Sequence, residues 1–221
     1  MKIQLEQVLP EEIEVRSFEL ITEEIGELQM DEGYASIVKR VIHTTADFDF
    51  AANLVFSPGV LEQALEALRQ GACIVTDTQM AMAGINKKAL KTLGVEVYNF
   101  MGDDDVAELA KKNHTTRAVA CIDKAAALGL PMIFAIGNAP TALVRIYELI
   151  QEGKLVPKLV IGTPVGFVNV VQSKELILTL PIPYIVSRGR KGGSNVAAAI
   201  VNALLYMLYD RKNQSLVERK S

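Results

Sequence analysis

The sequence contains no tryptophan, only two cysteines and two histidines, and no basic run interleaved with aromatic residues. Cys73 and Cys121 lie far apart with no partner at metal-binding spacing, which argues against a zinc site or a disulfide framework. The formal net charge is −3, so a nucleic-acid surface has little support. These absences predict a protein without a bound metal or a nucleic-acid partner.

Long hydrophobic runs are also absent. The uncharged stretch 125–144 is long enough to span a bilayer, but glycines and prolines divide it into a helix end, a strand and a turn. The segment 1–17 is acidic and lacks the apolar core of a secretory signal. We therefore expect a cytoplasmic protein that does not bind membranes.

What is present is the composition of a packed protein: 50% of the 221 residues are hydrophobic and 22% are charged. Short apolar, β-branched runs alternate with helical patterns, which is typical of βαβ units. We predict a single domain over residues 1–221, of the α/β class, with three α/β/α layers around a mostly parallel sheet. Strands are expected at 73–77, 95–99, 131–136, 158–162 and 183–187.

Two helices are expected before the first of these strands, over about 10–28 and 32–46, and others over 59–70 and 193–209. On the second helix Arg40 and His43 share the polar arc, opposite the apolar one, and are neighbours one turn apart. This arc suits a solvated surface as well as a basic site. Ser17 lies at the edge of the apolar stripe of the first helix, where a serine usually bonds back to its own backbone but could equally face a ligand.

Three glycine-containing segments follow predicted strands, at 135–143, 161–169 and 187–195. They are expected to meet at the carboxyl edge of the sheet, where open parallel sheets bind ligands. In the first segment, Asn138 or Thr141 could cap a helix whose backbone N–H groups face that edge. The third segment carries cations suited to carboxylates or phosphates, namely Arg188, Arg190 and Lys191.

The patterns alone leave the chemistry open. The candidates for acid-base work near neutral pH are His43, His114, Asp77, Asp47 and Asp49. The acidic run 103–105 is expected only to complement the start of a helix. An anion-binding α/β protein is favoured, and segment 187–195 by itself would suit a phosphate ester or nucleotide, although the residue order of a P-loop is missing.

Longer strings of residues resemble precorrin-8X methylmutase and its cobalt-dependent counterpart. They occur in the family's order from about residue 10 to 209, as VRSF (15–18), KRVIHTTADF (39–48), VFSP (55–58), VTDTQMAMAGI (75–85), AIGNAPTAL (135–143), GTPVGFVNVVQSKE (162–175) and SRGRKGGSNVAAAIVNALL (187–205). The resemblance implies an isomerase of corrin (cobalamin) biosynthesis, which moves a methyl group from ring carbon 11 to carbon 12 without an external cofactor. A non-catalytic corrinoid carrier with the same fold is the alternative.

The resemblance places the family's catalytic histidine at His43, which would protonate a ring nitrogen and so promote a 1,5-sigmatropic methyl shift. It implies that Ser17 and Arg40 contact the carboxylate-fringed substrate, with Arg117 and then Arg16 as further contacts. Weaker candidates are Lys174, Arg188 and Arg190, and His114 could assist Arg117.

The stretch TTADFDF after the histidine resembles the enzymes that act on cobalt-precorrin-8, so cobalt would enter within the substrate and not as a protein-bound metal. Family members are typically homodimers. The resemblance therefore also implies a homodimer, and a product that is handed over to neighbouring enzymes of the pathway.

Overall fold

A six-stranded sheet lies at the centre of the computed structural model, which describes residues 8–10, 12–26 and 28–218, with side chains as far as Tyr209. The strand order is β1-β6-β5-β4-β2-β3, and every neighbouring pair is parallel except β1 and β6. The predicted α/β class and mostly parallel sheet are confirmed, and each predicted strand is found within its expected range. The strands are β1 (Leu54–Phe56), β2 (Cys73–Thr76), β3 (Val97–Tyr98), β4 (Met132–Ile136), β5 (Leu159–Gly162) and β6 (Tyr184–Ser187).

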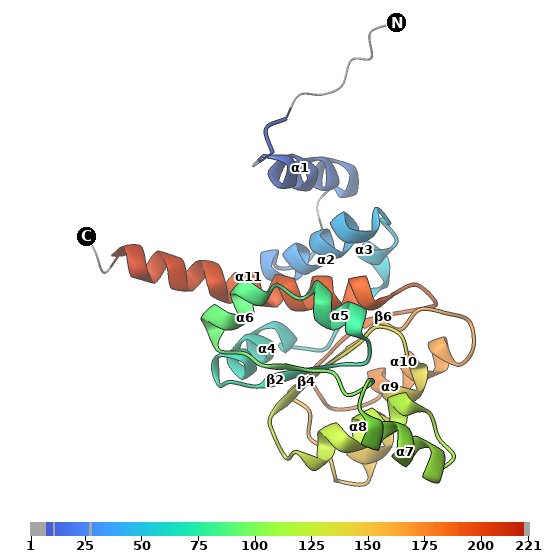
Figure 1. Ribbon diagram of the computed structural model, residues 1–221. Helices are drawn as coiled ribbons and strands as arrows, with labels where there is room; N and C mark the ends of the chain where they lie inside the picture. Colours follow the sequence, from blue (N-terminus) through green and yellow to red (C-terminus); the bar gives the residue numbers. More distant parts are fainter. Residues whose placement is uncertain (1–7, 11, 27, 219–221) are drawn as a thin grey trace, which may run out of the picture.

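Helices cover both faces of this sheet (Figure 1). One face carries α4 (Val60–Arg69) and α11 (Ser194–Glu218), with α5 (Gln79–Gly84) and α6 (Lys87–Leu93) packed against α11. The other face carries α8 (Arg117–Ala127), α9 (Pro140–Gln151) and α10 (Val170–Leu178), and α7 (Asp104–Lys112) packs on α8. Strands covered on both faces must be apolar throughout, which is why β2, β4 and β5 are uninterrupted apolar runs.

The predicted pair of N-terminal helices forms an additional layer outside α11 (Figure 1). Helix α2 (Glu32–Thr45) packs along α11, α1 (Ile13–Ile25) packs on α2, and the short α3 (Phe50–Asn53) follows. Helix α11 therefore lies between the sheet and α2. This position explains why side chains on both faces of α11 are buried between residues 196 and 208, among them Val196, Ala198, Ala199, Ile200, Val201, Ala203, Leu204 and Leu208.

Two features differ from the expected elements. Strand β1, which has three residues, was not among the predicted strands, because so short a run carries no readable alternation. Helix α11 continues to Glu218 instead of ending near residue 209, and no glycine or proline follows residue 193 to stop it. Within the described part of the chain, no helix combines the length and the apolar character needed to cross a bilayer.

Candidate functional site

His43 lies in the last turn of α2 with its side chain exposed beside α1. The Phe18 ring from α1 stacks on the imidazole, with 5.3 Å between ring centroids and 19° between ring planes. Arg40, one turn earlier on α2, places its guanidinium carbon 5.1 Å from the Phe18 centroid and 4.7 Å from that of Tyr206 on α11. These four residues, the His43 cluster, join three helices. The predicted proximity of Arg40 and His43 is confirmed.

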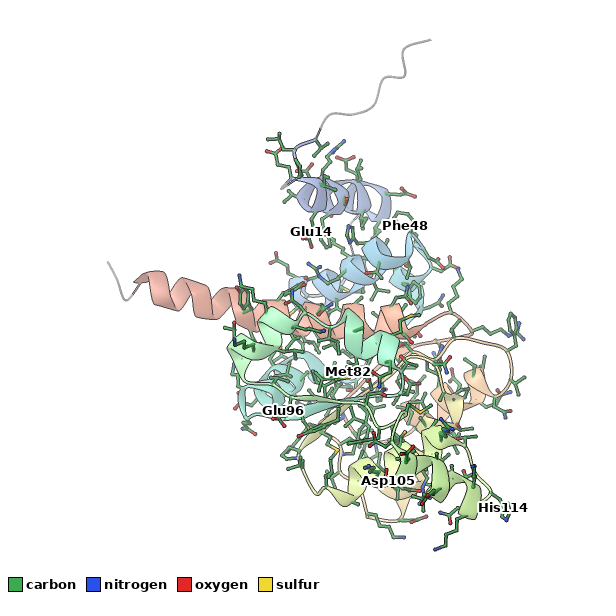
Figure 2. The ribbon with its side chains drawn as sticks, viewed as in Figure 1. Glu14, Phe48, Met82, Glu96, Asp105 and His114 are labelled. Carbon is green, nitrogen blue, oxygen red and sulfur yellow. The ribbon has the colours of Figure 1, made fainter. Side chains whose placement is uncertain are left out.

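The charge of Arg40 is balanced by Glu14 of α1, whose carboxylate lies 2.9 Å from the guanidinium. Figure 2 labels Glu14 on the side of α1 that faces α2. The Glu14 side chain is 56% exposed, so the ion pair contributes little to the free energy of unfolding. A guanidinium held over aromatic rings can also bind a planar carboxylate from a ligand. A ligand carboxylate can therefore take the place of Glu14 on Arg40.

The other predicted residues of α1 are engaged within that helix. The Ser17 hydroxyl donates to the carbonyl of Ile13 at 2.7 Å, which is the back-bonded arrangement expected for a serine at this position. Its oxygen can still accept a hydrogen bond. The Arg16 guanidinium lies 3.2 Å from Glu19 and 3.9 Å from Glu23. Ser17 thus directly precedes Phe18 of the His43 cluster in the sequence, and Arg16 forms ion pairs on the surface of α1.

The three loops predicted to meet at the carboxyl edge do so, but one is closed by the protein itself. Asp77, buried at the end of β2, accepts hydrogen bonds from the backbone N–H groups of Gly137, Asn138 and Ala139 at 2.8, 2.8 and 2.6 Å. Burial raises the pKa of the Asp77 carboxyl, and the three donors oppose that rise. The expected ligand-facing N–H groups of this loop are therefore already occupied.

The start of α9 also differs from the expected one. Helix α9 begins at Pro140 with Ala139 in the capping position, and neither Asn138 nor Thr141 caps it. A Cβ on Gly137 would lie 2.6 Å from the Cα of Ser194, so only glycine lets this loop approach the start of α11. Asp77 fixes that close approach, which makes it a structural carboxylate and removes it from the candidates for acid-base work.

The basic loop 188–193 after β6 presents its cations in different ways. Arg188 forms a two-point ion pair with Glu175 at 2.9 and 3.0 Å. The guanidinium of Arg190 lies 5.5 Å from the ring of Phe167, a side chain that is 82% exposed. Lys174 does not face solvent: it is fully buried and donates to the carbonyls of Gly189 and Lys191 at 2.9 and 2.8 Å. Burial lowers the pKa of Lys174 to about 8.

Asp47 and Asp49, the other carboxylates considered for acid-base work, both bind the ammonium group of Lys191. This hydrogen-bonded contact lowers the pKa of Asp47. A carboxylate held in its charged form near neutral pH is a poor proton donor. The acidic run 103–105 lies at the start of α7 as expected, and Asp103 and Asp105 also bind Lys124.

Arg117 belongs to a different part of the molecule from His43. It is the exposed first residue of α8, directly after Thr116, whose hydroxyl lies 3.1 Å from that of Thr141 at the start of α9. It therefore lies on the α8–α9 side of the sheet, whereas Ser17, Arg40 and His43 lie on the α1–α2 side. His114 is exposed in the α7–α8 connection, at the end of the molecule opposite α1 in Figure 2.

Three neighbours of Arg40 were not predicted from the sequence, namely Glu14, Phe18 and Tyr206. Glu14 and Phe18 are four residues apart on α1, so they share one helical face and could have been read together. Tyr206 comes from the other end of the chain and carries no local signal. Among the residues that the structure describes, no group of three or more His, Cys, Asp or Glu side chains could hold a metal ion.

Comparison with known proteins identifies a family that this chain resembles over most of its length. The model of the precorrin-8X methylmutase family matches residues 12–207. Cobalt-precorrin-8 methylmutase of Priestia megaterium is 45% identical over 89% of this chain and 88% of its own length. Its counterpart of Salmonella typhimurium is 46% identical over 90% of this chain and 96% of its own length.

A relative that is named for precorrin-8X and a solved structure match as well. Precorrin-8X methylmutase of Pseudomonas aeruginosa is 35% identical over 86% of this chain and 91% of its own length. The crystal structure of precorrin-8X methyl mutase from Thermus thermophilus superposes with a TM-score of 0.83 and 38% identity, covering 90% of this chain and 98% of that one. With this agreement in both sequence and fold, the chain belongs to the precorrin-8X methylmutase family.

Proposed function

We propose that this chain is an isomerase of corrin biosynthesis that moves a methyl group from ring carbon 11 to carbon 12 of precorrin-8 or cobalt-precorrin-8, giving hydrogenobyrinic or cobyrinic acid. Membership of the family supports this activity. The observation that carries it is the exposed imidazole of His43, stacked on Phe18 and one helical turn from Arg40. A proton donor beside a carboxylate-binding cation suits a ring fringed with carboxylates.

His43 is proposed to act as the proton donor. An imidazole can act both as an acid and as a base, so it can give a proton to a nitrogen of the substrate ring and take it back in each turnover. The protonated ring is poorer in electrons, which favours the shift: the bond from the methyl group to carbon 11 breaks as the bond to carbon 12 forms. No atom is gained or lost, and no external cofactor is required.

Arg40 is proposed to bind a substrate carboxylate in place of Glu14, with the Ser17 oxygen accepting a hydrogen bond from the substrate nearby. Arg16 is a further proposed contact. The contact predicted for Arg117 stays a prediction, because Arg117 lies on the α8–α9 side of the sheet and His43 on the α1–α2 side. The net charge of −3 does not oppose binding of an acidic ligand, because guanidinium groups act locally and at short range.

The cobalt-containing substrate is the form we favour. The two relatives above that are 45% and 46% identical carry the cobalt-precorrin-8 name, and the relative named for the metal-free substrate is 35% identical. Cobalt would then be part of the substrate and not a metal held by the protein.

A homodimer is the proposed assembly, formed through the outer surface of α1. Exposed apolar side chains lie on both flanks of that surface, Ile13 at 53% and Leu20 at 44% exposure on one flank and Val15 at 60% on the other. A helix that packs mainly on α2 and exposes such residues is suited to contact a second copy of the chain. The cytoplasm as location, one domain over 1–221 and hand-over of the product to neighbouring enzymes remain predictions.

The direct test is to mix the purified protein with precorrin-8 or cobalt-precorrin-8 and follow the visible spectrum of the ring. Conversion of many equivalents is expected with at least one of them. A change that stops after one equivalent would instead indicate the non-catalytic carrier, an alternative that no observation favours. No spectral change with either compound would contradict the proposed activity.

The role of His43 is tested with His43→Ala. Loss of the proton donor is expected to lower kcat by about 100-fold or more. The affinity for the product ring should change little, because the carboxylate contacts remain; titration of the ring spectrum measures it. Full activity of His43→Ala would exclude His43 as the proton donor.

A further inference from the structure

The segment directly after His43 is a tight turn with little freedom. Helix α2 ends at Thr45, and Ala46 adopts a left-handed conformation with φ of 51°. The N–H of Asp47 donates to the Thr45 hydroxyl at 3.3 Å, and the N–H of Asp49 donates to the Asp47 carboxylate at 3.1 Å. The position of this turn therefore sets the position of the helix end that carries His43.

One side chain from the far end of the chain holds both carboxylates of the turn. The ammonium nitrogen of Lys191 lies 2.7 Å from an oxygen of Asp47 and 2.6 Å from an oxygen of Asp49. The contact lowers the pKa of Asp47 and raises the pKa of Lys191, so the groups are charged near neutral pH. Lys191 comes from the loop between β6 and α11 and thus links the α1–α2 layer to the edge of the sheet.

The backbone of Lys191 is itself firmly anchored. Its carbonyl accepts hydrogen bonds from the buried Lys174 ammonium at 2.8 Å and from the Ser187 hydroxyl at 3.0 Å. The next residue, Gly192, lies so close to the end of β5 that a Cβ would overlap the carbonyl oxygen of Thr163. The lysine therefore holds the turn from a fixed point on the sheet.

We propose that Lys191 is a positioning residue: by binding Asp47 and Asp49 it fixes the end of α2 and so places His43 against the substrate ring. This inference rests on the proposed function, in which His43 is the proton donor. Proton transfer requires the donor within hydrogen-bond distance of its acceptor, and a displacement of about 1 Å can slow a reaction by about 100-fold. Lys191 acts through this geometry and does not contact the substrate.

The test compares variants at both ends of the contact. Lys191→Met and the double variant Asp47→Asn/Asp49→Asn are each expected to lower kcat about tenfold, with the product affinity changed by less than about twofold. Because both remove the same contact, combining them should cost no more than either alone. Lys191→Arg, which retains the charge, should recover most of kcat.

Lys124→Met is the matched control, because Lys124 likewise binds two aspartates, Asp103 and Asp105, each at 2.7 Å. Asp105 lies far from α1 in Figure 2, so this variant should keep the kcat of the original protein. Product titration reports folding of every variant. If Lys191→Met does not fold, Asp49→Asn, which removes an exposed carboxylate of the turn, carries the same test.

Three results would overturn the proposal. Unchanged kcat in Lys191→Met would leave the contact a purely structural one. A raised KM with unchanged kcat would make Lys191 a substrate contact, and the aspartate variants would then not reproduce its effect. If the losses of kcat in Lys191→Met and in the aspartate double variant were fully additive, Lys191 and the two aspartates would act independently of each other. The proposed function fails independently, if His43→Ala retains its activity; an inactive His43→Ala with a normal Lys191→Met refutes only the positioning role.

Discussion

Arg40 is held by a carboxylate 2.9 Å from its guanidinium and by two aromatic rings, whose centroids lie 5.1 and 4.7 Å from the guanidinium carbon. The carboxylate belongs to Glu14, and it is bound to the same guanidinium group that we propose as the binding site of a substrate carboxylate. Glu14 therefore competes with the substrate, at a cost limited by its exposure.

Glu14→Gln should consequently improve substrate binding. Since an exposed ion pair contributes at most about 1 kcal/mol, KM is expected to fall by up to about fivefold, with kcat unchanged. Arg40→Gln should act in the opposite direction and raise KM. Steady-state kinetics measure both, and Glu24→Gln, which removes the same charge from α1, serves as the control. A higher KM in Glu14→Gln would mean that Glu14 orients Arg40 instead of competing for it.

The hydrogen bonds of Asp77 could not be predicted from the sequence. A glycine, a proline and small polar residues after a strand predict backbone N–H groups that face the edge of the sheet, and the loop has such groups. The sequence does not reveal that a carboxylate 60 residues earlier in the chain accepts the hydrogen bonds of three of them. The local chemistry of the loop could be predicted, but its occupant depends on which strands are neighbours in the sheet, here β2 and β4.

Among the elements, the basic loop 188–193 is held in place by the buried amine of Lys174, which donates hydrogen bonds to two of its carbonyls. Burial lowers the pKa of this amine to about 8, from about 10.4 in an unfolded chain. Between these values the unfolded chain binds the extra proton, so the free energy of unfolding contributed by Lys174 rises with pH. The contribution is present above about pH 10.4 and is lost as the pH falls through 8.

Lys174→Met should remove this dependence. As the pH is raised from 8 to about 10.4, the free energy of unfolding of the original protein is expected to increase, relative to that of the variant, by up to about 3 kcal/mol. Urea unfolding at several pH values measures it, with exposed Lys158→Met as the control. Parallel curves for the original protein and Lys174→Met would show that the buried amine keeps an ordinary pKa.

The elements differ in how far the sequence predicts them. The buried strands β2, β4 and β5 were predicted within one or two residues, since strands covered on both faces are continuous apolar runs. Strand β1 was missed, because its pairing with β6 is set by distant residues. On α2 the arc with Arg40 and His43 follows directly from helical periodicity, whereas Tyr206 joins them only because α11 packs against α2.

For the whole molecule, the outer surface of α1 gives the proposed homodimer a test. Val15→Asp places a charge at an exposed apolar position on one flank of that surface and is expected to produce a monomer, because burying an unpaired carboxylate costs several kcal/mol. Light scattering measures the mass. Val156→Asp, at a site that is 81% exposed before β5, is the control and should leave the assembly unchanged. A monomeric original protein, or a dimeric Val15→Asp, would contradict an interface through α1.

The packing of α2 on α11 joins residues from the first fifth of the chain to the last helix. During synthesis on the ribosome, the apolar residues Ile37, Val38 and Val41 therefore cannot pack against α11 until that helix has emerged. Contacts between segments so distant in sequence form late and slowly. Helix α2, which carries His43, is thus synthesised early but packs against α11 late. Until then its apolar surface is exposed, and such a surface binds chaperones and promotes self-association.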